Sequence, residues 1–333
     1  MQPGSLHSLG RRPVPAPPAA RRRPSGRTAA YPGRPLFGAA LCYLFALGLT
    51  CLFFLFTRVG QWLDGLLLPR AERGGGYQQQ TALVGPAKTV LAHFGNPLLL
   101  AALLGAVLLV ALLRRRPVAG VVAVGLVLCA VAVAGAAKSV LPRPDLQVES
   151  STTHNSFPSG HVVAATALLL AFMLVLPGWA RRWLAVPGAV GVSVVASATM
   201  IAGWHRFSDA LGGVLLGVAL FCLAAAALEH RRVGGGPCGG IEPHGAAGPS
   251  GEIEPRGGSF GGRVPGGLVE AALGLVVLVW VLLAVGPGLT ESVDRGPLIA
   301  IVAVTGSTML AVGSAVLLLG AGEGSRGRPD VRK

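Results

Sequence analysis

Three short polar clusters interrupt an otherwise apolar stretch, and they hold the residues whose types suit chemistry. They lie at 138–144 (KSVLPRP), 157–161 (FPSGH) and 203–209 (GWHRFSD). Histidine can act as a nucleophile or an acid, while basic side chains and the N–H groups at a helix start bind anions. The set favours chemistry on a phosphate group, provided that the three clusters meet on one side of a membrane.

The second cluster places Pro-Ser-Gly-His directly before an apolar run that predicts a helix. Backbone N–H groups at a helix N-terminus lack intrahelical acceptors, and the helix dipole favours an anion there. Ser159 adds a hydroxyl donor and cap, Gly160 allows close approach of the backbone, and His161 lies at the rim. The same residues also fit a capped helix start with an interfacial histidine, so both interpretations stand at this point.

In the third cluster, His205 and Asp209 are four residues apart and share one face if a helix begins early. A carboxylate on one imidazole nitrogen fixes the tautomer, leaves the other nitrogen free to attack and stabilises the resulting cation. The alternative is an interfacial histidine beside an ordinary first-turn aspartate. In the first cluster, Lys138 and Arg143 are either phosphate ligands or head-group anchors.

Composition indicates an integral membrane protein. Hydrophobic residues make up 52% of the 333 and charged residues only 13%, too few to cover a soluble globule. The net charge of +14 sits in the tails and loops, where contact with anionic lipid explains it and no nucleic-acid partner is expected. The cysteines show no metal or disulfide spacing, and no cofactor is expected.

The apolar runs predict an all-α fold with eight membrane spans, and no broken helix pair of the inverted-repeat transporter type is expected. The predicted spans are 36–56, 97–113, 118–137, 161–178, 183–203, 210–228, 267–286 and 298–319. The predicted domains are a disordered basic tail (1–35), a six-helix core (36–228), a Gly/Pro-rich linker (229–266), a two-helix extension (267–320) and a basic tail (321–333).

The distribution of arginines predicts the orientation. With a cytoplasmic N-terminus, every basic loop and both tails lie inside, as the positive-inside rule requires. These basic segments are 114–116, 181–182, 231–232 and 326–333. The first two polar clusters follow three spans and the third follows five, and odd numbers of spans end on the same face. All three clusters are therefore expected outside the cytoplasm, on a protein of the plasma membrane.

The clusters, in this order and at these helix ends, resemble the type 2 phosphatidic acid phosphatase (PAP2) superfamily. That family's pattern is Lys-x6-Arg-Pro, then Pro-Ser-Gly-His, then Ser-Arg-x5-His-x3-Asp, and the resemblance covers roughly residues 36–228. It implies a six-helix core and metal-independent hydrolysis of lipid phosphates through a phosphohistidine. By position, the resemblance makes His205 the nucleophile, Asp209 its partner, His161 the acid for the leaving oxygen, and Lys138, Ser159 and Gly160 phosphate ligands.

The chain departs from the family pattern at two places. Asp145 stands where an arginine is expected, with Arg143 two residues earlier, and Ala198-Thr199 replaces the Ser-Arg pair. Arg143 is the expected substitute, and Arg206 is a second that could instead point to lipid head groups. Loss of both charges would leave a weak or inactive enzyme, because phosphoryl transfer depends on cationic stabilisation.

The leading hypothesis is a phosphatase acting on a lipid phosphate or lipid pyrophosphate, with membrane lipids as its surroundings. A phosphotransferase of the same fold would pass the phosphoryl group to an acceptor other than water. A non-enzymatic scaffold or carrier would keep the fold without the reaction. A zinc hydrolase is disfavoured because no ligand run such as His-Glu-x-x-His is present. Neither the lipid nor the oligomeric state can be predicted.

Overall fold

The computed structural model describes residues 34–67, 71–72, 75–76, 82–148, 151, 153–234 and 295–324. Several sequence predictions lie outside these residues. They are almost all of the N-terminal tail, the span at 267–286, the linker from residue 235 onward and the C-terminal tail from residue 325 onward.

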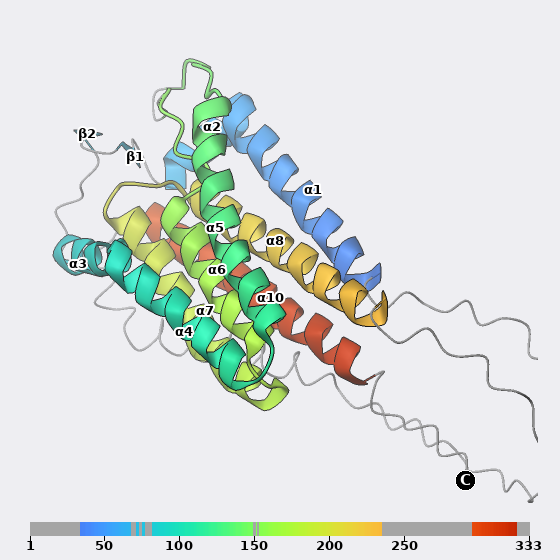
Figure 1. Cartoon of the computed structure of the whole chain (residues 1–333). Helices are drawn as coiled ribbons and strands as arrows, with labels where there is room; N and C mark the ends of the chain where they lie inside the picture. Colours follow the sequence, from blue (N-terminus) through green and yellow to red (C-terminus); the bar gives the residue numbers. More distant parts are fainter. Residues whose placement is uncertain are drawn as a thin grey trace, which may run out of the picture. The chain divides into compact units, whose positions relative to one another are not determined.

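The fold is all-α, apart from a two-residue ladder between β1 (Ala71–Glu72) and β2 (Gly75–Gly76). Proline and asparagine punctuate the apolar runs: Asn96 accepts a hydrogen bond from the Leu98 N–H, and Pro97 and Pro117 each occupy a first helical position. The helices, coloured along the chain in Figure 1, are α1 (Arg34–Phe56), α2 (Arg58–Leu67), α3 (Val84–Phe94), α4 (Pro97–Leu113), α5 (Pro117–Val140), α6 (Gly160–Val175), α7 (Gly178–Ile201), α8 (Phe207–Gly234) and α10 (Arg295–Gly324).

Within the described residues, five helices are long and apolar enough to cross a membrane: α1, α5, α7, α8 and α10. The pair α3 and α4, bent by 55° at a short break, makes a sixth if the two count as one span, and the apolar α6 has 16 residues. The chain is thus an all-α membrane protein, as its composition predicts. Each predicted span that falls on described residues overlaps one helix closely, although the spans 161–178 and 183–203 extend past the ends of α6 and α7.

Helices α3 and α4 form a bent pair, because the Asn96 cap and Pro97 start a new helix instead of extending α3. One expectation needs correction. The core was expected to end at residue 228, yet α8 continues to Gly234. The last turns carry arginines that suit a helix end at the membrane surface.

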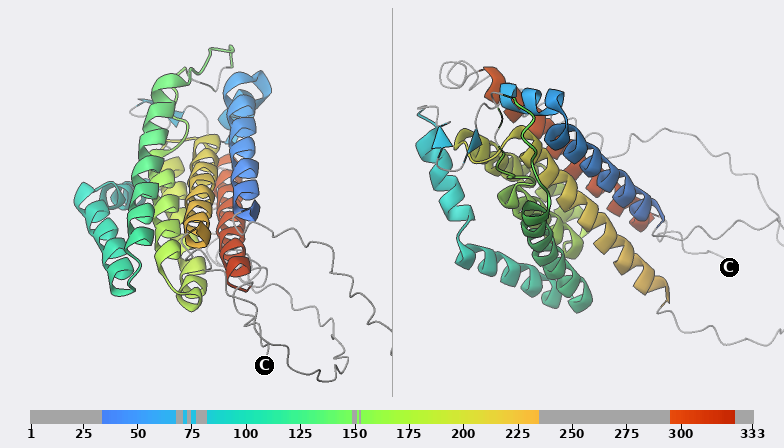
Figure 2. Two further views of the ribbon diagram at one scale, coloured as in Figure 1. Left: turned by 45° about the vertical axis from the view of Figure 1, so that its right-hand side comes forward. Right: turned by 90° about the horizontal axis from the view of Figure 1, so that it is seen from above.

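Helix α8 lies at the centre of the packing and contacts α1, α5, α6 and α10. Figures 1 and 2 show α1 and α8 running side by side. A Cβ atom on Gly212 would lie 2.3 Å from the Phe157 ring, and one on Gly213 would lie 2.9 Å from Val162 Cβ. Only glycine permits this approach, which brings the start of α8 against the Pro-Ser-Gly-His turn.

Helix α10, from the predicted C-terminal extension, packs on the core. It contacts α7 and α8, and Tyr43 on α1 shares a 2.6 Å hydrogen bond with Ser314. Hydrogen bonds of this kind between apolar helices contribute modestly to their association. This extension helix is therefore part of the same helical unit as the site.

Candidate active site

His205 and Asp209 face each other at the junction of α7 and α8. The turn between the helices is made by Gly203, whose φ is 69°, and the His205 N–H donates to the Thr199 carbonyl oxygen. His205 Nδ1 lies 3.4 Å from Asp209 Oδ2, slightly beyond an ordinary N–H···O hydrogen bond, and both side chains are buried. The carboxylate thus faces one ring nitrogen, as nucleophilic use of the other requires.

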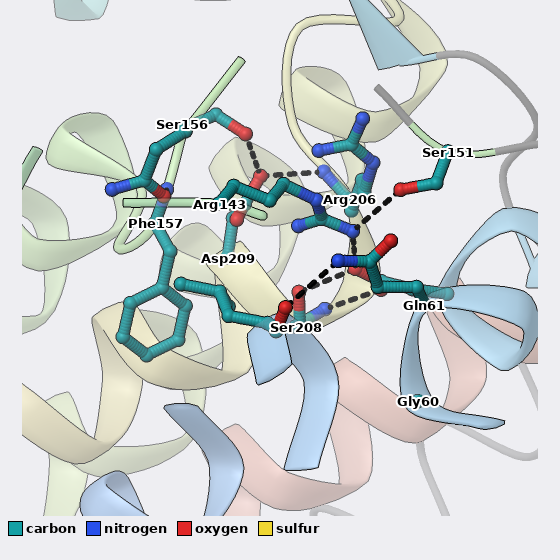
Figure 3. Close-up of polar contacts among 12 residues, drawn as sticks. Gly60, Gln61, Arg143, Ser151, Ser156, Phe157, Arg206, Ser208 and Asp209 are labelled. Atoms are coloured by element: carbon teal, nitrogen blue, oxygen red, sulfur yellow. Dashed lines mark hydrogen bonds and ion pairs between the residues drawn. The ribbon is translucent and has the colours of Figure 1, made fainter. Parts of the chain in front are cut away.

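The Asp209 carboxylate is held on two further sides (Figure 3). Its Oδ2 accepts hydrogen bonds from the Ser156 hydroxyl and, at 2.9 Å, from the Arg206 N–H. Because α8 begins at Phe207, Asp209 is the third residue of the helix and reaches back to the N–H of its cap residue, as in a capping box. The start of the helix therefore fixes the carboxylate that faces His205.

The Pro-Ser-Gly-His turn is tied to both neighbouring segments. Asn155 donates through Nδ2 to the Leu141 carbonyl oxygen at 2.8 Å and accepts from the Phe157 N–H at 3.0 Å. The Ser159 N–H donates to the backbone carbonyl of Asp209 at 2.9 Å. These bonds connect the loop after α5, the start of α6 and the start of α8, so all three polar clusters meet.

Ser159 differs from its expected role. It occupies the N-cap position of α6, but its side chain makes no capping hydrogen bond. Its Oγ is buried and has no hydrogen-bond partner in the part of the chain that the structure describes. A buried hydroxyl without a partner costs free energy, so this position suits a ligand oxygen better than a helix cap.

Lys138 and His161 lie beside the same turn. Lys138 is in the last turn of α5, and a Cβ atom on Gly160 would lie 3.7 Å from its Nζ. His161, in the first turn of α6, has its ring 5.9 Å from the Trp204 ring, centroid to centroid. A Cβ atom on Gly95 would lie 3.3 Å from His161 Nε2, so the bend between α3 and α4 borders this imidazole.

Two buried arginines, Arg143 and Arg206, lie close to Asp209 (Figure 3). Arg143 Nη2 lies 3.6 Å from Asp64 Oδ2 and donates to Ser151 Oγ at 3.4 Å, while its Nε and Nη1 have no hydrogen-bond partner among the described residues. Burial, and then the charge of Arg206, lower the pKa of Arg143. Arg206 is fully buried, so the expectation that it could point to lipid head groups is wrong.

At the two positions where the family pattern has an arginine, this chain has residues that make hydrogen bonds with the backbone. Asp145 is exposed, and its Oδ1 accepts from the Gln147 N–H at 2.9 Å. Thr199 is buried, donates through its hydroxyl to the Ala196 carbonyl, and accepts from the turn that carries His205. Cationic groups therefore reach the site from Arg143 and Arg206.

Sequence reasoning missed Asp64, Ser156 and Ser208. The Asp64 carboxylate is fully buried, accepts two hydrogen bonds from Ser208 and pairs with Arg143. Burial, and then the charge of Asp209, raise the pKa of Asp64 to about 6, although both arginines act in the opposite direction. The available signal was the spacing of three between Gln61 and Asp64, which puts both polar groups on one face of a short helix.

In the described residues, no three His, Cys, Asp or Glu side chains converge in a way that could hold a metal ion. The polar groups gathered here are instead a histidine facing a carboxylate, a second histidine and three cationic side chains. Such a set suits an anion that carries a transferable group.

Comparison with known proteins supports this description. The family model of the PAP2 superfamily matches residues 119–232, which include every site residue named above except Gln61, Asp64 and Gly95. No curated protein and no solved structure matches the chain. The matched segment runs from the first turn of α5 to near the end of α8, and this part of the chain is similar to a PAP2 superfamily domain.

Proposed function

We propose that this protein is a membrane phosphatase that hydrolyses a lipid phosphate or lipid pyrophosphate through a phosphohistidine. The observation that carries the proposal is the buried contact between His205 and Asp209, with Arg143 and Arg206 beside Asp209. A PAP2 superfamily domain implies phosphatase chemistry on lipid phosphates in general. The nucleophile, its orienting acid and the cations for the phosphate come from residues of this chain.

In the first step, Asp209 accepts the Nδ1–H of His205 and Nε2 attacks the phosphorus. The N–P bond forms as the bond from phosphorus to the leaving oxygen breaks, and His161 gives its proton to that oxygen. The leaving oxygen is the lipid oxygen of a monophosphate or the bridging oxygen of a pyrophosphate. In the second step, water attacks the phosphorus and loses a proton to His161 while the N–P bond breaks. Inorganic phosphate leaves, and both histidines return to their starting protonation states.

The phosphate oxygens would be held by Arg143, Arg206, Lys138, the Ser159 hydroxyl and the N–H groups at the start of α6. Catalysis of phosphoryl transfer comes mostly from positioning and electrostatic stabilisation, so the placement of these charges should contribute most of the rate enhancement. Each hydrogen bond to a charged group contributes about 1.5–3 kcal/mol. The buried Ser159 hydroxyl would gain a phosphate oxygen as its partner.

Charge placement supports an extracytoplasmic site. Arg114 Nη1 donates to the Val175 carbonyl oxygen at 3.1 Å, which places the basic loop after α4 at the end of α6 farthest from Gly160. Basic loops favour the cytoplasmic side, so the site belongs at the other face. A site there, between apolar helices, suits a phosphate whose tail stays in the bilayer.

The test is phosphate release by purified protein in detergent. A glycerolipid phosphate, an isoprenoid phosphate and an isoprenoid diphosphate are each supplied with a strong chelator and no other acceptor. We expect inorganic phosphate from at least one of them, and none from His205→Ala. Turnover that appears only with an added alcohol acceptor would indicate a phosphotransferase. If neither turnover nor orthovanadate binding is observed, the protein is a carrier or scaffold.

A further inference from the structure

Helix α2 presents its polar side to the protein interior. Gly60, Gln61 and Asp64 are buried, whereas Val59 and Trp62 are exposed. In water this arrangement would be inverted, but beside α1 in a membrane the apolar side meets lipid. A Cβ atom on Gly60 would lie 2.0 Å from the Phe53 carbonyl oxygen, so glycine is needed where α2 folds against the end of α1.

Gln61 ties this helix to the loop that carries Arg143. Its Nε2 donates to the Leu55 carbonyl oxygen at 2.8 Å and to the Pro144 carbonyl oxygen at 3.0 Å. The first bond holds α2 to α1, and the second holds it to the residue directly after Arg143. The backbone on which Arg143 stands is therefore attached to α2.

Asp64 reaches both Arg143 and the start of α8. Its Oδ2 lies 3.6 Å from Arg143 Nη2 and accepts from the Ser208 hydroxyl at 2.7 Å, while its Oδ1 accepts from the Ser208 N–H at 3.1 Å. The side chains of Asp64 and Arg143 are fully buried, so their interaction is weakly screened. Ser208 directly precedes Asp209, so one carboxylate contacts both the arginine and the helix that carries the orienting acid.

We propose that Asp64 is a positioning residue that fixes the Arg143 guanidinium for the transferring phosphoryl group, an inference that rests on the proposed function. Asp64 and Ser151 engage one end of the guanidinium, Nη2, and leave Nε and Nη1 directed elsewhere. A planar fork that is held at one end loses less freedom when the other nitrogens bind an oxyanion. Asp64 itself does not touch the substrate.

The first experiment measures kcat and KM for Asp64→Asn, Arg143→Gln and the double variant. Asparagine is isosteric and can still accept from Ser208, but it has no charge to hold the guanidinium. We expect kcat to fall about tenfold or more with KM unchanged or lower, because the anion is still attracted while its placement is lost. In the Arg143→Gln background, Asp64→Asn should lower kcat no further, since coupled residues are not additive.

Two controls separate this role from a purely structural one. Asp145→Asn removes an exposed carboxylate two residues from Arg143 and should leave kcat unchanged. Ser208→Ala removes the hydroxyl bond to Asp64 but keeps the ion pair, so it should lower kcat less than Asp64→Asn. If Asp64→Asn costs the same with and without Arg143, or if it only raises KM, the proposal is overturned.

Wild-type phosphate release reports on the proposed function, and the double-variant comparison reports on this inference, so their failures are distinguishable. Should Asp64→Asn alone not fold, the pairing predicts that Asp64→Asn with Arg143→Gln does fold, because no unpaired buried charge remains. Size-exclusion chromatography in detergent shows this directly. Failure of the double variant to fold as well would assign Asp64 to the fold alone and overturn the proposal.

Discussion

The Ser159 N–H donates to the backbone carbonyl of Asp209, which joins the start of α6 to the start of α8. Two helix N-termini therefore lie together, and the positive dipole ends of both helices favour an anion nearby. The turn that bears His205 leads into one of these termini, and His161 lies in the first turn of the other. This geometry brings clusters that are far apart in sequence to one place, as the proposed binding of a single phosphate requires.

Loss of the nucleophile should abolish both hydrolysis and the phosphoenzyme. His205→Ala leaves no imidazole facing Asp209 in the described residues, so no acid-labile phosphoenzyme should form from labelled substrate. His161→Ala should still form one with a substrate whose leaving group needs no proton, because only the acid is lost. Acid-quenched labelling followed by gel analysis distinguishes them. A labelled His205→Ala protein would assign the nucleophile elsewhere.

Both arginines should act through the planar geometry of the guanidinium group and not through charge alone. Arg143→Lys and Arg206→Lys keep the charge but lose the guanidinium geometry, and each should lower kcat about tenfold or more, given about 1.5–3 kcal/mol per charged hydrogen bond. We expect Arg206→Lys to lower kcat as much as Arg143→Lys does, because Arg206 is fully buried. Arg182→Lys, on the exposed surface of α7, is the matched control. An unaltered kcat in Arg143→Lys would show that the Arg143 guanidinium does not bind the transferring phosphoryl group.

Much of the fold could be predicted because apolar run length and helix start signals are local. The predicted span at 97–113 coincides with α4, since Asn96 and Pro97 mark its start within the sequence itself. The contact of His205 with Asp209 was also accessible, because four residues at a helix start share a face.

The rest depends on contacts that no local pattern encodes. The hydrogen bond between Asp64 and Ser208 joins residues 144 positions apart, and that between Ser156 and Asp209 joins residues 53 apart. Helix α2 has only ten residues, and its polar side faces the protein interior. A search for long hydrophobic runs therefore does not detect it. The burial of Arg206 likewise follows from how the helices pack around the site, which its neighbours in sequence do not reveal.

Close packing at Gly212 should be necessary for the site. Gly212→Ala would place a Cβ atom 2.3 Å from the Phe157 ring, and such overpacking costs about 1–3 kcal/mol. The ring must shift, which disturbs the turn that leads to Ser159, so both thermal stability in detergent and kcat should fall. Gly191→Ala in α7, where nothing lies within 4 Å, should be neutral or stabilising. Equal stability of the two variants would contradict the packing of α8 against this turn.

Membrane orientation can be tested with single cysteines in a cysteine-free background. Thr153, exposed in the loop before α6, and Ser292, in the predicted outer loop before α10, should react with an impermeant thiol reagent in intact cells after replacement by cysteine. A cysteine at Ser25 should react only after lysis, because the basic tail is expected inside. Labelling of Ser25 alone in intact cells would place the site on the cytoplasmic side.

The titration of Asp64 should appear in the pH dependence of turnover. Its pKa is raised from 3.8 to about 6, so the carboxyl group is mostly ionised at pH 7 and mostly neutral at pH 5. Arg143, Arg206, Ser208 and Asp209 surround it, and protonation removes the charge that holds Arg143. We expect kcat to fall as pH drops through about 6. In Asp64→Asn this part of the acid limb should vanish from an already lowered kcat. Identical acid limbs in the two proteins would show that Asp64 does not govern turnover by its charge.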